Sequence, residues 1–555
     1  MHCWISTRIR LGSVLLGGSL LLAASPSAAG KPLSLQEFTI HLPGAPATVV
    51  AADLDGDGIG DLIVVVAYTE WGQIVTAEEV EMSQVEGLVE MMTIVPALSD
   101  HREVLAFRGL PSGGFEAVGA PLALGLEVLS VLRGPTGVPV IALTDDGISE
   151  LRLEVDEGQP RLALVPLLER RSVLSFSGTL VSDLELVWDF DGDGLDDLLF
   201  PSPRTLDVFL STPEGLASTP VAEVPVPEDE GPYDRRRLYH LPTVADFDGD
   251  GLPDLLLREN DEWERFWVAR SLGGGRFAPP IEYAAHENES DSDEDDREPL
   301  LVHFGDVDGD GRAEYVVQEQ TDKEDVGWRK EIKQAKTPHF RYSLHSAIDD
   351  SATGHLAMDG AARLQFDAVG YGFGASSDEI SLPFGLQDLD GDGLPDLVTV
   401  SLDFSLLQVF RILATKSLSI GMNFHVSCQQ ADGSFREVTG LDLSGKFKLR
   451  LDDLRVGRLS QFNGDFDGDG RRDFLQIGRG RRVSIHRGRP GCRYPSAPDL
   501  EIRLREEPKN LALVKVRDLD GDGLSDLLVV QPQAGSDDGA TSPVRLDLYL
   551  SRGSG

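Results

Sequence analysis

Asp53-Leu54-Asp55-Gly56-Asp57-Gly58-Ile59-Gly60-Asp61 is the first of seven copies of one nine-residue pattern in a chain of 555 residues. The other six copies begin at Asp189, Asp246, Asp306, Asp388, Asp465 and Asp518. Successive copies start 136, 57, 60, 82, 77 and 53 residues apart. Repeats of this length that are built from short strands are typical of a β-propeller rather than of a helical solenoid.

Short apolar runs follow the copies, as in Leu62–Val66 and Leu527–Val530. Because these runs are apolar at consecutive positions, both faces of each strand are expected to be buried, as in the inner strands of a blade. A third strand is predicted after several copies, at Val104–Phe107, Val208–Leu210, Phe266–Val268 and Val409–Phe410. A glycine-containing turn with an aromatic residue just beyond it then leads into the next strand.

The interval of 136 residues between the first two copies is large enough for two units. Leu126–Leu132 and Val138–Leu143 are apolar runs joined by a turn, and residues 151–155 alternate between apolar and charged side chains. These are strand patterns, so the interval contains a unit without a carboxylate loop. The sequence therefore predicts eight units, and seven blades are the alternative if two units merge.

The two ends of the chain predict how the ring closes. The last unit ends with an alternating strand over Val544–Leu550 and has no fourth strand, whereas Phe38, Ile40 and Leu42 alternate with polar residues in an orphan strand near the other end. That orphan strand would complete the last blade and remove two exposed sheet edges. We predict an all-β fold, a single β-propeller domain over residues 30–555 with eight four-stranded antiparallel blades.

The nine-residue pattern matches the oxygen ligands that Ca²⁺ prefers. Positions 1, 3 and 5 offer aspartate carboxylates, position 7 offers its backbone carbonyl, and position 9 offers a closing Asp or, in the fourth copy, Glu. Glycines at positions 4 and 6 allow the chain to wrap closely around an ion. No copy contains a soft ligand, which argues against zinc or copper. An EF-hand is excluded because it needs a twelve-residue loop between two helices.

The predicted ligands are the first, third, fifth, seventh and ninth residues of each copy. They are Asp53, Asp55, Asp57, Ile59, Asp61, Asp189, Asp191, Asp193, Leu195, Asp197, Asp246, Asp248, Asp250, Leu252, Asp254, Asp306, Asp308, Asp310, Arg312, Glu314, Asp388, Asp390, Asp392, Leu394, Asp396, Asp465, Asp467, Asp469, Arg471, Asp473, Asp518, Asp520, Asp522, Leu524 and Asp526. The seven loops place 28 carboxylates close together, and seven Ca²⁺ ions would cancel 14 of these charges. About seven structural calcium ions are therefore expected; the alternative is a set of solvated Asp-Gly turns that bind nothing.

The net charge of the chain indicates which partners are disfavoured, and its first residues indicate where the protein is located. With 93 acidic and 50 basic residues the formal net charge is −43, which disfavours nucleic acids and anionic membrane surfaces as partners. Residues 1–29 have the pattern of a signal peptide, with arginines, a short apolar stretch and a small-residue cleavage site. A secreted, periplasmic or cell-surface protein without membrane insertion after signal cleavage is predicted. An uncleaved anchor is the alternative.

Cleavage after residue 29 would leave two cysteines, Cys428 and Cys492. An even pair in an exported protein is compatible with one disulfide. Sequence alone does not bring their Cα atoms within bridging distance, so two free buried thiols remain the alternative.

Two insertions interrupt the repeat. Residues 286–298 form an almost entirely acidic loop, which is expected either to be solvated or to bind cations or a basic partner. Residues 321–382 enlarge the fifth unit and contain the basic stretch Trp328–Lys333 and the segment Tyr371–Gly374. Aromatic side chains on a glycine-rich segment could bind a sugar or a peptide, or could instead add to the packing of the blade.

The segments Phe304–Gly311 and Asp465–Gly470 resemble the FG-GAP repeat, also called the VCBS repeat, of integrin α-subunit propellers and many exported bacterial proteins. The resemblance extends from about Phe38 to Leu550. It implies that the loops lie between the first two strands of each blade, that calcium there is structural, and that ligands bind on other loops, often at the opposite face. The second unit lacks the carboxylates and is expected to bind no ion.

Three classes of function remain open. The first is a binding or adhesion module for an extracellular protein or glycan, the second is a lyase-like enzyme that acts on polysaccharides, and the third is a passive structural component of the cell envelope. The sequence contains no His-Glu-x-x-His, Gly-x-Ser-x-Gly or Walker motif, and no catalytic residue is assigned. Binding is favoured because no catalytic constellation is visible and because the resemblance points the same way.

Overall fold

The computed structural model describes residues 33–68, 101–125, 127–173, 184–213, 215–227, 242–247, 250–258, 265–284, 300–310, 312–321, 336–350, 355–358, 360–373, 385–403, 417–440, 443–450, 455–456, 459–478, 480–508, 514–532 and 544–552. Several predicted features lie outside these residues. They are the signal peptide, the acidic loop at 286–298, the basic stretch Trp328–Lys333 and the strand at Val409–Phe410. In the described part of the chain, no helix has the length and apolar character needed to cross a membrane.

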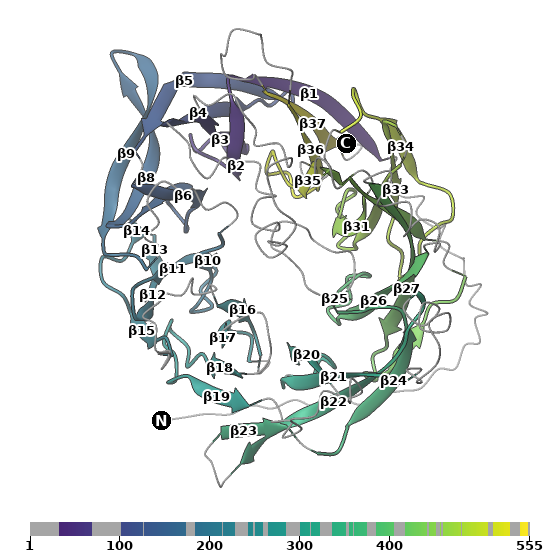
Figure 1. The fold of residues 1–555 in the computed structure, drawn as a ribbon. Coiled ribbons are helices and arrows are strands. Elements are labelled where there is room, and N and C mark those ends of the chain that lie inside the picture. The colour runs from purple at the N-terminus through teal and green to yellow at the C-terminus, as the bar shows by residue number, and fades with distance from the viewer. Residues whose placement is uncertain are drawn as a thin grey trace, which may run out of the picture.

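Every described element is a β-strand, and the strands form eight blades arranged in a ring (Figure 1). The first three blades are separate four-stranded antiparallel sheets. Blade 1 consists of β2 (Ala45–Ala52), β3 (Asp61–Tyr68), β4 (His101–Gly109) and β5 (Phe115–Leu124). Blade 2 consists of β6 (Val128–Arg133), β7 (Val140–Thr144), β8 (Gly147–Asp156) and β9 (Gln159–Glu169). Blade 3 consists of β10 (Val187–Trp188), β11 (Asp197–Pro201), β12 (Thr205–Phe209) and β15 (Ala222–Pro225), with a small ribbon of β13 (Ser211–Thr212) and β14 (Gly215–Leu216).

Blades 4 and 5 are joined into one sheet because β23 (His355–Met358) pairs with a strand of each. Blade 4 consists of β16 (Thr243–Ala245), β17 (Asp254–Arg258), β18 (Arg265–Ala269) and β19 (Ile281–Ala284). Blade 5 consists of β20 (Leu300–Gly305), β21 (Glu314–Gln320), β22 (His339–Asp350) and β24 (Leu364–Val369). The insertion predicted in the fifth unit therefore adds β-structure at the outer part of this blade, where β22 continues beyond β24 to pair with β23.

The last three blades complete the ring. Blade 6 consists of β25 (Gly385–Gln387), β26 (Asp396–Asp403), β27 (Ser417–Gln429) and β29 (Ser444–Arg450), with β28 (Phe435–Glu437) and β30 (Arg455–Val456) at its edge. Blade 7 consists of β31 (Leu459–Gly464), β32 (Asp473–Ile477), β33 (Arg482–His486) and β34 (Leu500–Arg503). Blade 8 consists of β35 (Val514–Arg517), β36 (Asp526–Pro532), β37 (Val544–Arg552) and β1 (Ser34–Leu42). The prediction of eight four-stranded blades, one of them without a carboxylate loop, is confirmed.

The ring closes through the orphan strand that the sequence predicts. Strand β1 pairs antiparallel with β37, so that Phe38 lies opposite Leu548 and Ile40 lies opposite Leu546. The first described strand thus becomes the fourth strand of the last blade, as Figure 1 shows. Without this pairing, β37 would be an edge strand with a row of unpaired backbone groups. With it, blade 8 has four strands, as a complete blade does.

The core lies between the blades, and strand β3 shows why its sequence is apolar at every position. All eight of its residues are buried. Leu62, Val64 and Val66 pack with residues of blade 8, whereas Ile63 and Val65 pack with residues of blade 2. Alternate side chains of a strand point to opposite faces, and here each face meets a neighbouring blade. Burial of each such side chain contributes about 1.5–3 kcal/mol, which makes the inter-blade contacts the main apolar stabilisation of the ring.

Candidate metal centres

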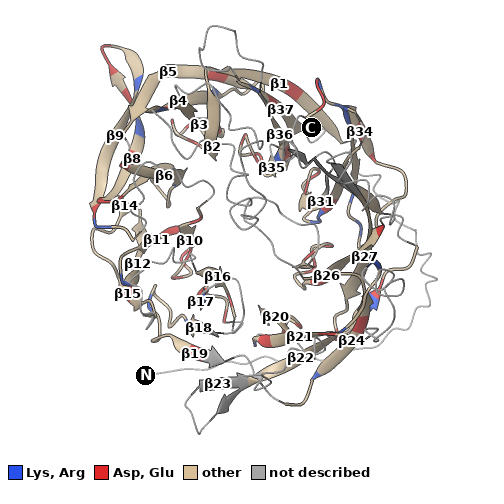
Figure 2. Cartoon of the chain, in the orientation of Figure 1, with Lys and Arg blue, Asp and Glu red and all other residues tan. Residues whose placement is uncertain are grey.

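Each carboxylate loop connects the first and second strands of a blade. The first copy, residues 53–61, joins β2 to β3, and the remaining copies occupy the same connection in blades 3 to 8. The acidic residues of these loops line the inner side of the ring in Figure 2. This placement agrees with what the FG-GAP resemblance implies. In blade 2 the corresponding turn between β6 and β7 contains no carboxylate.

The first aspartate of each copy organises the loop. Asp53 Oδ1 accepts hydrogen bonds from the N–H groups of Gly56 at 2.8 Å and Asp57 at 3.1 Å, and Asp53 Oδ2 accepts one from Gly58 at 2.8 Å. Gly56 and Gly58 have φ angles of 77° and 84°, in the left-handed region that favours glycine. The alternating Asp-Gly sequence is therefore the local cause of the tight turn. The same contacts recur around Asp189 and Asp465.

The ninth carboxylate connects the loop to the rest of the blade. Asp61 begins β3 and is 3% exposed. Its Oδ2 accepts the N–H of Leu54 inside the loop at 2.9 Å, and its Oδ1 accepts the N–H of Gly109 at the end of the third strand at 2.8 Å. The six copies that end in Asp repeat both bonds, at 2.9–3.0 Å and 2.6–2.9 Å respectively; their closing residues are Asp61, Asp197, Asp254, Asp396, Asp473 and Asp526.

The predicted ligands converge in space. One carboxylate oxygen from each of Asp53, Asp55 and Asp57 lies within 4.8 Å of the others, and the same holds for three acidic residues in each of the copies that begin at Asp189, Asp306 and Asp388. The seventh residue of the first copy, Ile59, donates its N–H to Asp57 Oδ1 at 2.9 Å. Asp248, the third residue of the copy in blade 4, lies outside the described residues.

The third aspartate supplies the test of whether a metal ion fits. Oδ1 of Asp390, of Asp467 and of Asp520 is buried and has no hydrogen-bond partner among the described residues. The other oxygen of Asp390 accepts a hydrogen bond from Gly491 N–H at 2.6 Å, and that of Asp520 accepts one from Arg552 Nη1 at 2.5 Å. The other oxygen of Asp467 forms an ion pair with Arg487 Nε at 3.1 Å. A buried carboxylate oxygen without a donor is costly. A hard cation at the centre of the loop would satisfy it, so these donor sets fit Ca²⁺.

The electrostatic environment of the closing carboxylates also favours a cation. Burial raises the pKa of Asp197 to about 6, of Asp396 and Asp473 to about 7, and of Asp526 to about 8. Neighbouring carboxylates of the same loops raise these pKa values further, while the two backbone N–H donors lower them. A divalent ion would reverse the repulsion and favour the ionised forms.

These pKa values predict how the metal-free protein responds to pH. Folding raises the pKa of the closing carboxylates from 3.8 to about 6–8, so the protonated form is the one that folding favours. Their stabilising contribution is fully present below the ordinary pKa and is lost as the pH rises through about 6–8. In excess chelator, we expect the melting temperature measured by calorimetry to fall between about pH 5 and about pH 8.5.

The matched control for the pH experiment is the same protein in excess calcium. A bound ion keeps the carboxylates ionised, so the fall over this pH interval is expected to disappear. A melting temperature that rises between the same two pH values in the chelator would contradict the assignment of these buried carboxylates.

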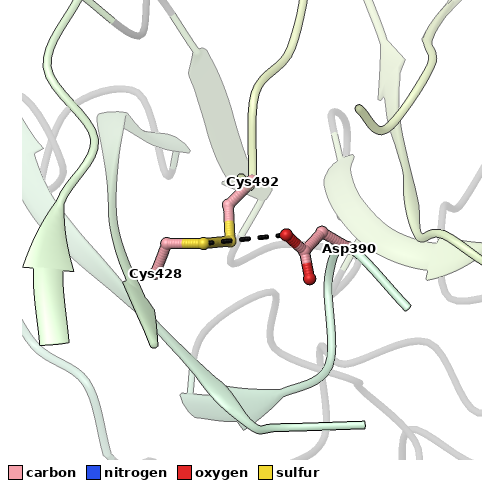
Figure 3. Close-up of side chains that lie close together, drawn as sticks. All are labelled: Asp390, Cys428 and Cys492. Carbon is pink, nitrogen blue, oxygen red and sulfur yellow. Dashed lines mark hydrogen bonds between the residues drawn. A yellow bond between two sulfur atoms is a disulfide. The ribbon is translucent and has the colours of Figure 1, made fainter. Parts of the chain in front are cut away.

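A disulfide lies beside the loop of blade 6. Cys428 of β27 is bonded to Cys492, which lies between β33 and β34 of blade 7, and both residues are buried. Their Cα atoms are 5.8 Å apart, within the usual bridging range. Figure 3 shows the bridge against Asp390, with Cys428 Sγ at 3.9 Å from Asp390 Oδ2. Of the two alternatives for these cysteines, the structure contains the disulfide.

Removal of this bridge tests how much it stabilises the contact between blades 6 and 7. It closes a loop of 64 residues, and a bridge of this span contributes about 2–4 kcal/mol to the free energy of unfolding. The double variant Cys428→Ala/Cys492→Ala is expected to lose that amount in denaturant titrations. Reductant should destabilise the native protein similarly and leave the double variant unchanged; equal stability of native and double-variant proteins would contradict the prediction.

Some contacts of the loops have no counterpart in the sequence analysis. The arginines that contact third-position aspartates, such as Arg487 and Arg552, follow or end the third strand of the same blade.

Tyr371 and Phe373, predicted either to form a binding platform or to pack, are half-buried against the cluster of blades 5 and 6. Their ring centroids lie 5.9 Å from Phe340 and 5.8 Å from Tyr342, respectively, which favours packing.

A hollow of about 580 Å³ lies between blades 1, 2 and 8, where sequence analysis gives no motif. It is lined by residues 48–53 of β2 and its loop, by residues 131–133 of β6, and by Arg517 and Asp518. Arg517 Nη1 donates to the carbonyl of Val49 at 2.9 Å, so this guanidinium is positioned by the first blade. The hollow therefore combines strand backbone, arginine side chains and the edges of two carboxylate loops.

One family model matches part of the chain. Residues 189–257 and 246–317 match the model of the FG-GAP-like repeat family. No curated protein matches the chain. An Agrocybe aegerita lectin, whose structure concerns specific recognition of non-reducing terminal N-acetylglucosamine, shares 16% identity over 73% of this chain and 87% of that chain, with a TM-score of 0.35.

Two further solved structures are similar at lower TM-scores. A Lactobacillus plantarum protein shares 11% identity over 74% of this chain and 92% of that chain, with a TM-score of 0.27. The family 117 glycoside hydrolase Zg3597 of Zobellia galactanivorans shares 15% identity over 53% of this chain and 73% of that chain, with a TM-score of 0.20. Residues 189–257 and 246–317 are therefore FG-GAP-like repeats within a β-propeller of eight blades.

Proposed function

We propose that this propeller is an exported, calcium-stabilised scaffold that binds an extracellular protein or glycan. The observation that carries the calcium assignment is the buried, unpartnered Oδ1 of the third aspartate in blades 6, 7 and 8. In each of these loops, the other oxygen of that aspartate is already paired with a group outside the loop, through a hydrogen bond or an ion pair. The remaining oxygen is thereby left for an ion.

The ion would be held by the carboxylates of positions 1, 3, 5 and 9 and by the carbonyl of position 7. Calcium supplies a divalent charge that offsets the repulsion among these carboxylates. The protein contributes the geometry: the ninth carboxylate is hydrogen-bonded both to the loop and to the third strand, as Asp61 is to Leu54 and Gly109. An ordered loop therefore stiffens the connection between the inner strands of its blade.

The ligand site that we propose is the hollow between blades 1, 2 and 8. Binding sites are concave and combine apolar walls with a few polar groups. Here the walls are valines and alanines of β2 and β6, and the polar groups include Arg133 and Arg517. Arg133 is 68% exposed at its side chain and pairs with Asp196 at 2.6 Å, so it is accessible to a ligand. Backbone groups and guanidinium donors of this kind suit the hydroxyls or carboxylates of a glycan, or an extended peptide.

A glycan array and a pull-down from extracellular proteins, both in calcium buffer, test the binding proposal. We expect at least one ligand whose binding falls about tenfold or more in Arg133→Glu, because charge reversal at the hollow would oppose it. Arg161→Glu is the matched control, since Arg161 is an exposed residue of β9 outside the hollow. Binding that is equally weakened by both variants, or by neither, would contradict the hollow as the site.

A further inference from the structure

The loop of blade 5 differs from the other carboxylate loops at its closing residue, Glu314. Glu314 is fully buried, and its Oε2 accepts the N–H of Val307 at 3.0 Å, as the closing aspartates do with the equivalent residue of their loops. Its Oε1 has no hydrogen-bond partner among the described residues. In the six copies that end in Asp, the corresponding oxygen accepts an N–H from the end of the third strand or from a residue just after it. The longer side chain of Glu314 thus leaves one buried oxygen available within the loop.

That oxygen faces a guanidinium group of the same blade. Arg363 lies just before β24, and its backbone N–H is bonded to the carbonyl of Leu344 in β22 at 2.8 Å. Its side chain reaches three carboxylates of the loop: Nη2 lies 2.9 Å from Asp308 Oδ2, and Nη1 lies 2.6 Å from Asp310 Oδ2 and 3.6 Å from Glu314 Oε1. One cation therefore contacts positions 3, 5 and 9 of the loop together.

The arginines at the other loops are placed differently. In the blade 7 loop Arg487 contacts the third residue and Arg471 contacts the fifth, and in the blade 8 loop Arg552 contacts the third and fifth residues. Among the ion pairs between described residues, the one that involves a closing, ninth-position carboxylate is the pair of Arg363 with Glu314. An arginine that contacts only the third and fifth residues leaves the closing carboxylate to an ion, whereas Arg363 contacts all three carboxylates.

Calcium and this guanidinium would compete for the same oxygens. A calcium ion needs carboxylate oxygens at about 2.3–2.6 Å, and it would have to sit between Asp308, Asp310 and Glu314. A guanidinium in contact with those three residues already offsets part of their charge and would repel a divalent ion at contact distance. The two cations therefore exclude each other from the loop.

We propose that Arg363 is the resident cation of the blade 5 loop, so that this loop folds without calcium and the propeller binds six ions. This inference rests on the proposed calcium binding by the other loops and would lower the expected number of ions from about seven to six. The carboxylate loop of blade 5 would then stay ordered at any external calcium concentration, whereas the order of the other six loops would depend on calcium.

Counting bound calcium by equilibrium dialysis and elemental analysis tests the proposal. The native protein is expected to bind six ions, and Arg363→Gln, which removes the charge but keeps much of the side-chain length, is expected to bind seven. Arg341→Gln is the matched control and should bind six, because Arg341 of β22 pairs with Asp367 at 3.0 Å, away from the loop. Seven ions in the native protein, or six in Arg363→Gln, would overturn the proposal.

A second pair of variants keeps the test independent of the folding of Arg363→Gln. Asp308→Asn should leave the count at six, because the blade 5 loop does not bind calcium, whereas Asp467→Asn at the same position of the blade 7 loop should lower it to five. Loss of an ion in Asp308→Asn would also overturn the proposal. Absence of calcium from all of these proteins would instead contradict the proposed function on which the inference rests.

Discussion

We expect chelation of calcium to lower the melting temperature of this propeller by about 20 °C. An ion present at a hundred times its dissociation constant stabilises a protein by about 2.7 kcal/mol, so six independent loops would contribute about 16 kcal/mol. The structure describes about 370 residues, and for a folded chain of that size the entropy of unfolding corresponds to roughly 0.8 kcal/mol for each degree of shift in the melting temperature. Calorimetry in excess EGTA and in millimolar calcium provides the measurement.

The physical reason for so large an effect is the density of negative charge. Closing carboxylates such as Asp473 and Asp526 are fully buried, and each has two further carboxylates of its own loop among the groups that raise its pKa. Without an ion these groups must either repel one another or take up protons, and both cost folding free energy.

Two controls separate calcium binding from general ionic effects. Calcium added back after chelation should restore the melting temperature, and magnesium at the same concentration should restore much less, because its preference for an octahedral, partly hydrated shell fits these loops poorly. An unchanged melting temperature after chelation would contradict calcium as a structural cofactor.

The second large effect is expected from deletion of β1, which should prevent the ring from closing. Strand β1 pairs with β37 over nine residues, from Ser34 opposite Arg552 to Leu42 opposite Val544. Without it, β37 becomes an exposed apolar edge, which is a template for association with other chains. We expect a variant that lacks residues 34–42 to be recovered as aggregates, as measured by size-exclusion chromatography.

A pair of point variants in β1 provides the matched test. Ile40 is buried between blades 8 and 1, whereas the neighbouring His41 is exposed on the same strand. Ile40→Asp buries an unpaired charge and is expected to cost about 4 kcal/mol or more, whereas His41→Asp should change stability by about 0.5 kcal/mol or less. Equal stability of the two variants in denaturant titrations would contradict the role of β1 in closing the ring.

The fold could be predicted from the sequence because inner blade strands have an unusual pattern. A run such as Leu62–Val66 is apolar at consecutive positions, and the structure shows alternate residues packing on two different blades. The unit without carboxylates was predicted from the same kind of pattern and forms β6 to β9. Burial on both faces leaves a signal in consecutive residues, and that signal survives where the loop sequence has diverged.

Blade 6 shows where this kind of prediction is weaker. Its third strand in the described structure is β27, residues 417–429, which pairs with β26 along one part and with β29 along another. The strand includes polar residues such as Asn423 and His425, so it lacks a continuous apolar run. Tyr371 was likewise left between two interpretations, because its packing against Phe340 depends on the neighbouring strand.

The sequence by itself determined the ring of blades, the strand that closes it and the positions of the carboxylate loops. These features depend on residues that lie close together in the chain, such as the nine residues from Asp53 to Asp61. Only the tertiary structure decided what surrounds those carboxylates. Gly491 reaches Asp390 across 101 residues, and Arg363 reaches Asp310 across 53. Such contacts arise from the packing of blades and strands, and no spacing in the sequence records them.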